Sequence, residues 1–199
     1  MKILAFIPAR GGSKGIPGKN IKNFNGKPLI YWTIRNALKS QMVNDVVVSS
    51  DSIKILNIAK KFNSLIVKRP KNISGDSVST ESAVKHYIKK TKINYDYIVL
   101  LEPTNPLKRD DDIDNLIKKI VSKKYDSLFS ASKLIDFMIW KKNSESFKSF
   151  NYDFKKRGLR QERADNLYLE NGNIYIFKPK LILENNNRLG GKIGIFEMP

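Results

Sequence analysis

A short apolar run that passes directly into a glycine-rich, basic segment constrains the fold of this chain more than any other feature. The run covers residues 2–7 and has the composition of a buried strand. The segment that continues it, residues 7–20, reads IPARGGSKGIPGKN. Open α/β sheets bind phosphate groups at this place, because glycine lets backbone N–H groups approach phosphate oxygens closely. The segment therefore predicts an α/β fold with a phosphate-binding loop after the first strand.

The spacing within this loop excludes two common phosphate motifs. Five residues separate Gly12 from Gly18, and Asn20 follows Lys19, so the segment is not a Walker A loop. The dinucleotide pattern G-x-G-x-x-G is also absent. Arg10, Lys14 and Lys19 nevertheless place three cations in the loop, which favours a bound anion over a merely flexible basic loop.

The rest of the chain alternates short apolar runs with amphipathic stretches. Strands are expected at residues 2–7, 45–49, 65–67, 97–101, 127–131, 173–177 and 193–198. Helices are expected at residues 28–40, 52–62, 77–90 and 112–121. This alternation predicts a three-layer, mostly parallel Rossmann-like sheet. The pattern breaks over residues 136–163, which are aromatic, basic and irregular, so we expect an inserted arm within a single domain of residues 1–199.

The charge of the chain fits an anionic ligand. Its formal net charge is +18, and residues 1–44 contain no acidic residue. Such a field attracts a nucleic acid, an anionic membrane or a nucleotide triphosphate, although a solvated lysine-rich surface would give the same balance. The chain has no cysteine, which excludes disulfides and thiolate metal sites. It also has no apolar run of about 20 residues, so we expect a soluble, cytoplasmic protein with no membrane partner. His86 is the only histidine, and we expect it on a helix surface rather than in catalysis.

Six blocks of sequence, in order along nearly the whole chain, resemble one enzyme family. They comprise residues 7–20, GKPLI at 26–30, VSSD at 48–51, KRP at 68–70 with the following Asp76, Ser79 and Thr80, LLEPTNPLK at 100–108, and Arg160-Gln161 with NGNIYI at 171–176. The chain is thereby similar to the acylneuraminate cytidylyltransferases, or CMP-sialic acid synthetases, in their nonulosonate-activating branch. These enzymes are relatives of those that activate 3-deoxy-manno-octulosonate.

The resemblance implies a reaction and a nucleotide site. In this family the anomeric hydroxyl of the sugar attacks the α-phosphorus of CTP and pyrophosphate leaves. The resemblance makes Lys19 and Arg10 the catalytic cations, because they would face the transferring phosphoryl group. Arg69 would donate to N3 and O2 of cytosine. The residues implied to bind the nucleotide are Ala9, Arg10, Gly11, Gly12, Ser13, Lys14, Lys19, Asn20, Arg69, Asp76 and Thr80. Asp76 could equally be a helix or turn cap.

A second set of residues is implied to bind the sugar: Glu102, Thr104, Arg160, Gln161, Asn171 and Tyr175. An arginine such as Arg160 suits the sugar carboxylate, which it can hold with two hydrogen bonds. Glu102 replaces the commoner glutamine of the family, so an amide that can donate becomes an acceptor-only carboxylate. This change either alters which sugar fits or is a variant that the subfamily tolerates.

The resemblance also implies a metal ion and a partner subunit. The family binds catalytic Mg²⁺ (or Mn²⁺) through an Asp-x-Asp motif shortly after a Met-Pro such as Met198-Pro199. Because the sequence stops there, the metal ligands are unknown and are expected beyond Pro199. The family forms dimers whose arms complete each other's sugar sites, so we expect a homodimer. The arm carries Phe137, Met138, Ile139, Trp140, Phe147, Phe150 and Tyr152, an apolar set that favours a covering partner.

Three other functions remain open from the sequence. The first is a sister nucleotidyltransferase that acts on another sugar. The second is a non-catalytic remnant that binds CTP without turning it over. The third is a basic nucleic-acid-binding protein, but the chain lacks the interleaved aromatic residues or recognition helix that such a protein needs, so we expect no nucleic-acid partner.

Overall fold

The structure is a computed structural model that describes residues 1–13, 15–134, 137–159 and 167–198. The chain divides into two compact units. The first comprises Met1–Ser130 and Gly172–Phe196, and the second comprises Ala131–Asn171 and Glu197–Pro199.

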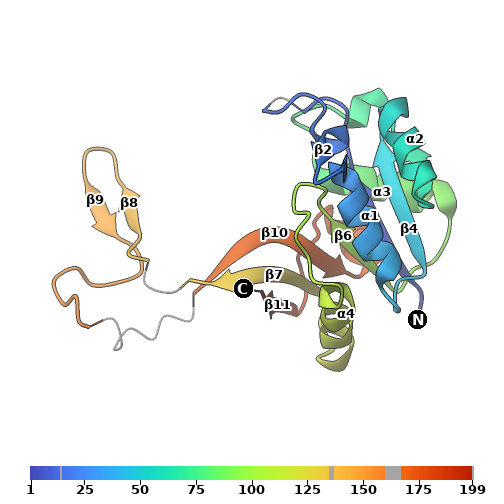
Figure 1. Cartoon of the computed structure of the whole chain (residues 1–199). Coiled ribbons are helices and arrows are strands. Elements are labelled where there is room, and N and C mark those ends of the chain that lie inside the picture. Colours follow the sequence, from blue (N-terminus) through green and yellow to red (C-terminus); the bar gives the residue numbers. More distant parts are fainter. Residues whose placement is uncertain (14, 135–136, 160–166, 199) are drawn as a thin grey trace. The chain divides into compact units, whose positions relative to one another are not determined.

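A central sheet organises the chain (Figure 1). Its strands in spatial order are β11 (Ile193–Glu197), β7 (Ser127–Lys133), β10 (Tyr168–Phe177), β6 (Tyr97–Leu101), β1 (Ile3–Pro8), β4 (Asp45–Ser50) and β5 (Leu65–Lys68). β1 pairs in parallel with both β4 and β6, and β4 pairs in parallel with β5, whereas β10 runs antiparallel to β6. The mostly parallel α/β fold that the sequence predicted is therefore confirmed.

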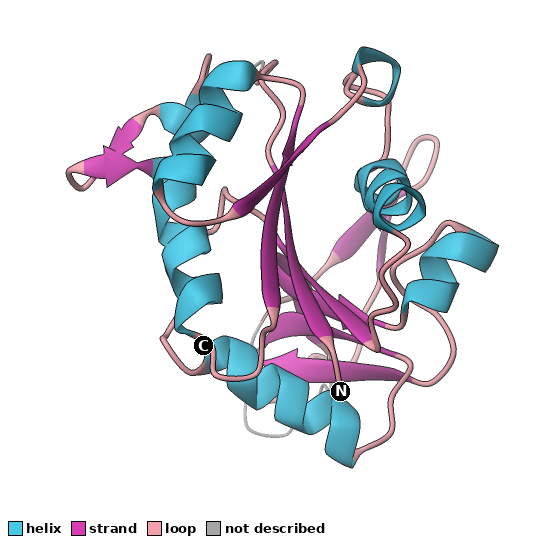
Figure 2. Ribbon diagram, turned by 90° about the vertical axis from the view of Figure 1, so that its right-hand side faces the viewer, coloured by secondary structure: helices cyan, strands magenta, loops and turns pink. Residues whose placement is uncertain are grey.

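Helices lie on both faces of this sheet (Figure 2). They are α1 (Leu29–Lys39), α2 (Ile53–Lys61), α3 (Thr80–Thr91), α4 (Asp112–Ser122) and α5 (Pro179–Asn185). Leu4 and Phe6 of β1 are fully buried and form one core with α3 and α5. Side chains alternate between the two faces along a strand, so Ile3, Ala5 and Ile7 are buried on the opposite face of the sheet. No helix in the described part of the chain is long and apolar enough to cross a membrane.

The strand order brings four loops to one edge of the sheet. β1, β4, β5 and β6 all point the same way, so their carboxyl ends meet there. From β1 the chain moves outward to β4 and β5 and then returns to β6 on the other side of β1. Such a switch point between neighbouring strands is where open α/β sheets bind ligands.

The long loop after β1 contains short elements that the sequence did not reveal. A 3-10 helix covers Lys19–Ile21, and a hairpin pairs β2 (Asn23–Phe24) with β3 (Lys27–Pro28). The hairpin turns at Asn25 and Gly26, which both have positive φ, as a two-residue type I′ turn requires. A further 3-10 helix, Lys71–Ile73, follows β5.

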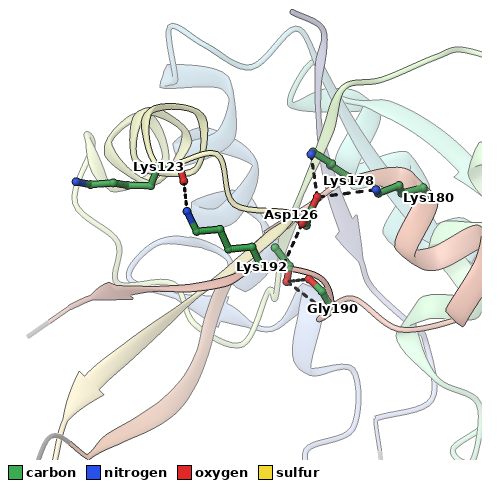
Figure 3. A network of polar contacts seen from close by, with 7 residues as sticks. Lys123, Asp126, Lys178, Lys180, Gly190 and Lys192 are labelled. Carbon is green, nitrogen blue, oxygen red and sulfur yellow. Dashed lines mark hydrogen bonds and ion pairs between the residues drawn. The ribbon is translucent and has the colours of Figure 1, made fainter.

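Within the first unit, hydrogen bonds to Asp126 hold the segment that connects α5 to β11 (Figure 3). Its carboxylate accepts hydrogen bonds from Lys178 Nζ at 2.8 Å and from the backbone N–H of Lys192 at 2.9 Å. The neighbouring hydroxyl of Ser127 donates to the carbonyl of Gly190 at 2.8 Å. These bonds fix the segment that carries Arg188.

The second unit contains a hairpin where the sequence suggested only irregular structure. β8 (Trp140–Lys142) pairs antiparallel with β9 (Phe147–Ser149). The ring of Trp140 lies 5.8 Å from the rings of both Tyr152 and Phe154. Phe147 nevertheless stays 65% exposed, so the hairpin keeps aromatic surface uncovered within the unit.

Candidate functional site

Three adjoining cavities open at the switch-point edge of the first unit. The Arg69 cavity has a volume of about 260 Å³ and is lined by Pro8, Arg10, Arg69, Ser74, Gly75, Asp76, Val78, Thr80 and Glu102. The loop cavity, of about 240 Å³, is lined by Pro8, Arg10, Ser13, Gly15, Lys19, Asn20, Glu102, Pro103 and Thr104. The hairpin cavity, of about 550 Å³, is lined by Ile16, Lys19, Lys22, Asn23, Phe24, Leu29, Thr104, Asn105, Pro106, Leu107 and Asn173. Each shares lining residues with the next, and we refer to the three together as the groove.

The glycine-rich loop is held in place by backbone contacts. The N–H of Ala9 donates to the carbonyl of Ser49 at 2.9 Å, and the N–H of Gly11 donates to Oδ1 of Asp51 at 2.9 Å. The buried Asn20 side chain donates from Nδ2 to the carbonyl of Arg10 at 3.0 Å. Asn20, which the resemblance assigns to nucleotide binding, thus uses one amide donor to hold the loop in place.

The side chain of Arg69, which lines the Arg69 cavity, has a hydrogen-bond donor with no partner among the described residues. Arg69 is only 6% exposed, and its backbone N–H continues the β5 pairing by donating to the carbonyl of Ser50. Among the described residues, no group accepts a hydrogen bond from its buried Nε. Burial lowers the pKa of its guanidinium, and the nearby Asp51 carboxylate opposes that shift. A buried donor without a partner is costly, which is the situation that a bound acceptor would relieve.

Arg10 and Asp76 face each other across the same cavity. The Arg10 guanidinium donates to the Asp76 carboxylate and forms an ion pair with it. Thr80, the first residue of α3, also lines this cavity. The structure thus brings together Arg10, Arg69, Asp76 and Thr80, which the resemblance had assigned to nucleotide binding from two separate blocks.

Glu102 lies where the Arg69 cavity meets the loop cavity. It is the residue directly after β6, and it lines both cavities together with Pro8 and Arg10. Burial raises the pKa of its carboxyl group, while Arg188, Lys108 and Lys19 counteract that rise. Burial also lowers the pKa of Lys108 to about 8. The Lys108 ammonium donates to the carbonyl of Asn105, which ties down the turn after β6.

Arg188 was not among the predicted site residues. Its Nε lies 2.6 Å from Oε1 of Glu81 in a largely buried ion pair. Its guanidinium also lies 4.7 Å from the centre of the Tyr175 ring. Burial acts to raise the pKa of Glu81, but the hydrogen bond and charge of Arg188, together with hydrogen bonds from the Glu81 backbone and from Ser79, outweigh it and the pKa is lowered. Arg188 stands in an irregular segment outside every motif, so no sequence signal pointed to it.

The residues predicted to bind the sugar are only partly brought together. Thr104 is exposed in the groove, and Tyr175 is buried on β10 opposite Leu100 of β6. Asn171 belongs to the second unit. Arg160 and Gln161 lie outside the described residues, as does Lys14 of the loop. His86 is half-buried on α3, and burial lowers its pKa.

The described residues offer no ready metal site. They contain no group of three or more histidine, cysteine, aspartate or glutamate side chains that could hold a metal ion. The carboxylates of Asp76 and Glu102 both border the Arg69 cavity, but they do not make up such a group. These residues alone therefore do not fit the Mg²⁺ ion that the resemblance implies.

Comparison with known proteins gives one consistent result. A family model described as "Cytidylyltransferase" matches residues 4–198. N-acylneuraminate cytidylyltransferase B of Danio rerio is 35% identical over 98% of this chain, which spans only 46% of that relative. Pseudaminic acid cytidylyltransferase of Campylobacter jejuni is 33% identical over the whole chain and 88% of the relative. CMP-N,N'-diacetyllegionaminic acid synthase of Legionella pneumophila is 32% identical over 94% of the chain and 82% of the relative.

A solved structure of another protein has a similar fold. The structure of CMP:2-keto-3-deoxy-manno-octonic acid synthetase complexed with CTP has a TM-score of 0.74 to this chain. It is 17% identical and covers 100% of this chain and 90% of the other. At that identity the likeness supports the fold alone.

Proposed function

The chain belongs to the cytidylyltransferase family, and from that premise we propose that it transfers CMP from CTP to the anomeric hydroxyl of a sialic-acid-type nonulosonic acid, releasing pyrophosphate. The named relatives that act on N-acylneuraminate, pseudaminic acid and a legionaminic acid support this substrate class. Because the chain spans about half of the first of these relatives, the activity of the whole protein is part of the proposal.

One observation carries the proposal. Arg69, whose buried Nε has no hydrogen-bond partner among the described residues, lines a cavity that shares Pro8, Arg10 and Glu102 with the cavity of the glycine-rich loop. We propose that cytosine lies at Arg69 and that the triphosphate lies along the loop. A guanidinium can donate to N3 of cytosine, whereas uracil carries a hydrogen at N3 and cannot accept there.

The chemistry assigned to the loop is mainly positioning and charge neutralisation. We propose that Lys19, which borders both the loop cavity and the hairpin cavity, stabilises the charge that develops at the α-phosphorus. Arg10 is assigned a second contact with the phosphates, for which it must exchange its bond to Asp76. Glu102 and Thr104, which line the groove, and Tyr175 of the same unit are proposed to contact the sugar. Asn171, Arg160 and Gln161 keep the sugar-binding role that the family resemblance implies.

A divalent cation and a second subunit also belong to the proposal. Mg²⁺ or Mn²⁺ would neutralise the triphosphate, but the described residues gather no ligands for it, and no step is assigned to it. The exposed aromatic surface of Phe137, Phe147 and Phe150 supports a homodimer formed through the second unit. A cytoplasmic location is proposed because CTP is a cytoplasmic substrate.

Pyrophosphate release tests this function. The protein is incubated with Mg²⁺, one of the four nucleoside triphosphates, and sialic, legionaminic or pseudaminic acid. Release is expected only when CTP and one of these acids are both present. Release that depends on a different nucleotide, or that proceeds without any sugar, would contradict the proposal.

A further inference from the structure

Arg10 and Asp76 belong to two different loops that line the Arg69 cavity. Arg10 is the second residue after β1, in the glycine-rich loop. The N–H of Ala9, the residue before it, donates to β4 at 2.9 Å, and the carbonyl of Arg10 accepts a hydrogen bond from Nδ2 of Asn20 at 3.0 Å. These bonds hold the backbone of Arg10, so its guanidinium can change partners by rotation of the side chain alone.

Asp76 lies in a tight turn between β5 and α3. The N–H of Val78 donates to the carbonyl of Gly75 at 3.3 Å, which closes the turn with Asp76 inside it. The Asp76 carboxylate accepts a hydrogen bond from the Arg10 guanidinium and forms an ion pair with it. The ion pair therefore links the glycine-rich loop to the segment that leads into α3.

Arg10 lies where negative charge can reach it from two sides. It lines both the Arg69 cavity and the loop cavity, the latter together with Lys19. Burial lowers the pKa of the Arg69 guanidinium, Asp51 opposes that shift, and the charge of Arg10 adds to it, because the two cations lie near each other. The Asp76 carboxylate offsets the charge of Arg10 in the Arg69 cavity, whereas the triphosphate of CTP would offset it from the loop cavity.

The ion pair is exposed enough to be exchanged. The side chain of Arg10 is 38% exposed and that of Asp76 is 41% exposed. Water screens an ion pair of this exposure, and such pairs contribute little to stability. A triphosphate, with several negative charges, attracts a guanidinium more strongly than a single carboxylate does. Asp76 can therefore orient Arg10 and still lose it to the phosphates.

Resting on the CTP site of the proposed function, we propose that Asp76 is a positioning residue for Arg10. Its carboxylate holds the guanidinium at the boundary of the two cavities before CTP binds and releases it to the phosphates when CTP binds. In this role Asp76 makes no contact with the nucleotide. An interaction that exists only in the nucleotide-free protein lowers the affinity for the nucleotide by its own strength. The ion pair therefore weakens CTP binding.

Asp76→Asn tests this role because it removes the charge and keeps the shape of the side chain. Isothermal titration of the complete chain with CTP and Mg²⁺ should show a dissociation constant about two- to fivefold lower than that of the parent, the size of one exposed ion pair. The KM for CTP should fall by a similar factor, which structural damage would not produce. Cytidine, which has no phosphate, should bind to the variant and the parent equally.

A second variant shows whether Asp76 acts through Arg10. In the Arg10→Met background, Asp76→Asn should no longer strengthen CTP binding, because the effects of two residues in one ion pair are not additive. The matched control is Asp110→Asn, which breaks another exposed ion pair, with Lys39 at 2.6 Å, and does not line the groove. This control should bind CTP as the parent does.

The outcomes separate this inference from the function on which it rests. Unchanged CTP affinity in Asp76→Asn would overturn the inference, and weaker binding would do the same by placing Asp76 in contact with the nucleotide. Stronger binding that persists in the Arg10→Met background would also overturn it, since Asp76 would then act through its charge alone. A parent that binds CTP without forming CMP-sugar would contradict the proposed function only, whereas a parent that binds no CTP would overturn both.

Discussion

A Cβ atom on Gly191 would lie 2.5 Å from the Asp126 carboxylate, so the carboxylate fits against this glycine with no room for a side chain. Gly191 also has a φ of +62°, a conformation that other residues adopt only with strain. The carboxylate that fills the space receives the N–H of Lys192 and the ammonium of Lys178 (Figure 3). The close approach is thus part of the arrangement that places Arg188.

Gly191→Ala is expected to be strongly destabilising. The left-handed backbone alone costs about 1–2 kcal/mol for alanine, and the overlap with Asp126 adds to it. Gly26→Ala is the matched control, because Gly26 has a φ of +79° but no neighbouring atom within 4 Å of the position that a Cβ would take. Thermal unfolding should therefore show a larger loss of Tm for Gly191→Ala than for Gly26→Ala. Equal losses would mean that Asp126 moves aside freely.

Arg69→Met should abolish discrimination between CTP and UTP. In the parent, CTP at 100 times its dissociation constant adds about 2.7 kcal/mol of stability, or roughly 5–10 °C in Tm for a chain of this length, and UTP, ATP and GTP at equal concentration add less. In the variant, CTP and UTP should produce the same small shift. Equal shifts by all four nucleotides in the parent would contradict a cytosine site at Arg69.

Lys19→Ala should lower turnover far more than nucleotide affinity. Loss of one charge-stabilising donor at the reacting group costs about 10²–10³ in kcat, while Arg10 and the loop amides still hold the phosphates. Lys54→Ala, which removes an exposed lysine on α2, serves as the control. Rapid-quench rates and CTP titrations should separate the two effects, and a parallel loss of both would place Lys19 in ground-state binding instead.

Glu102→Gln should alter stability with a definite dependence on pH. Because burial raises the pKa of Glu102 in the folded state, its contribution to stability is complete below the unfolded pKa and is lost as pH rises through the folded pKa. The Tm of the glutamine variant minus the Tm of the parent should therefore be larger at pH 8 than at pH 4.

Asp126→Asn provides the opposite control for this measurement. The hydrogen bond from Lys178 lowers the pKa of Asp126, so its contribution is present above the unfolded pKa and is lost as pH falls through the folded pKa. The Tm of this variant should be lower than that of the parent at pH 8, and the difference should be smaller at low pH. If the Tm differences between each variant and the parent stay constant with pH, the pKa shifts assigned to Glu102 and Asp126 are contradicted.

Local patterns predicted the sheet well because its strands carry their own signal. The apolar run at residues 97–101 became β6 with the same bounds, and the β-branched run from Asp45 became β4. The helix expected from Ser77 begins instead at Thr80, with Ser79 as its N-cap residue and no side-chain capping bond. Turns set such boundaries, and their geometry depends on neighbours far along the chain.

The candidate site was predictable only where a motif marked it. The glycine-rich loop and the blocks around Arg69 and Glu102 identified residues that the structure brings to one groove. Arg188 was not predictable, since it contacts Glu81 from 107 positions away and is placed by bonds between Asp126 and the segment around Lys192. Such long-range contacts leave no periodic pattern in a single sequence.

Transfer of an oxygen label tests the central claim most directly. The protein is given CTP, Mg²⁺ and a nonulosonic acid that carries ¹⁸O in its anomeric hydroxyl, and the products are identified by mass spectrometry. The account predicts a CMP-sugar in which the label bridges the sugar and phosphorus, with unlabelled pyrophosphate. Unlabelled CMP-sugar, labelled pyrophosphate, or CTP hydrolysed to CMP without a sugar adduct would contradict attack by the sugar on the α-phosphorus.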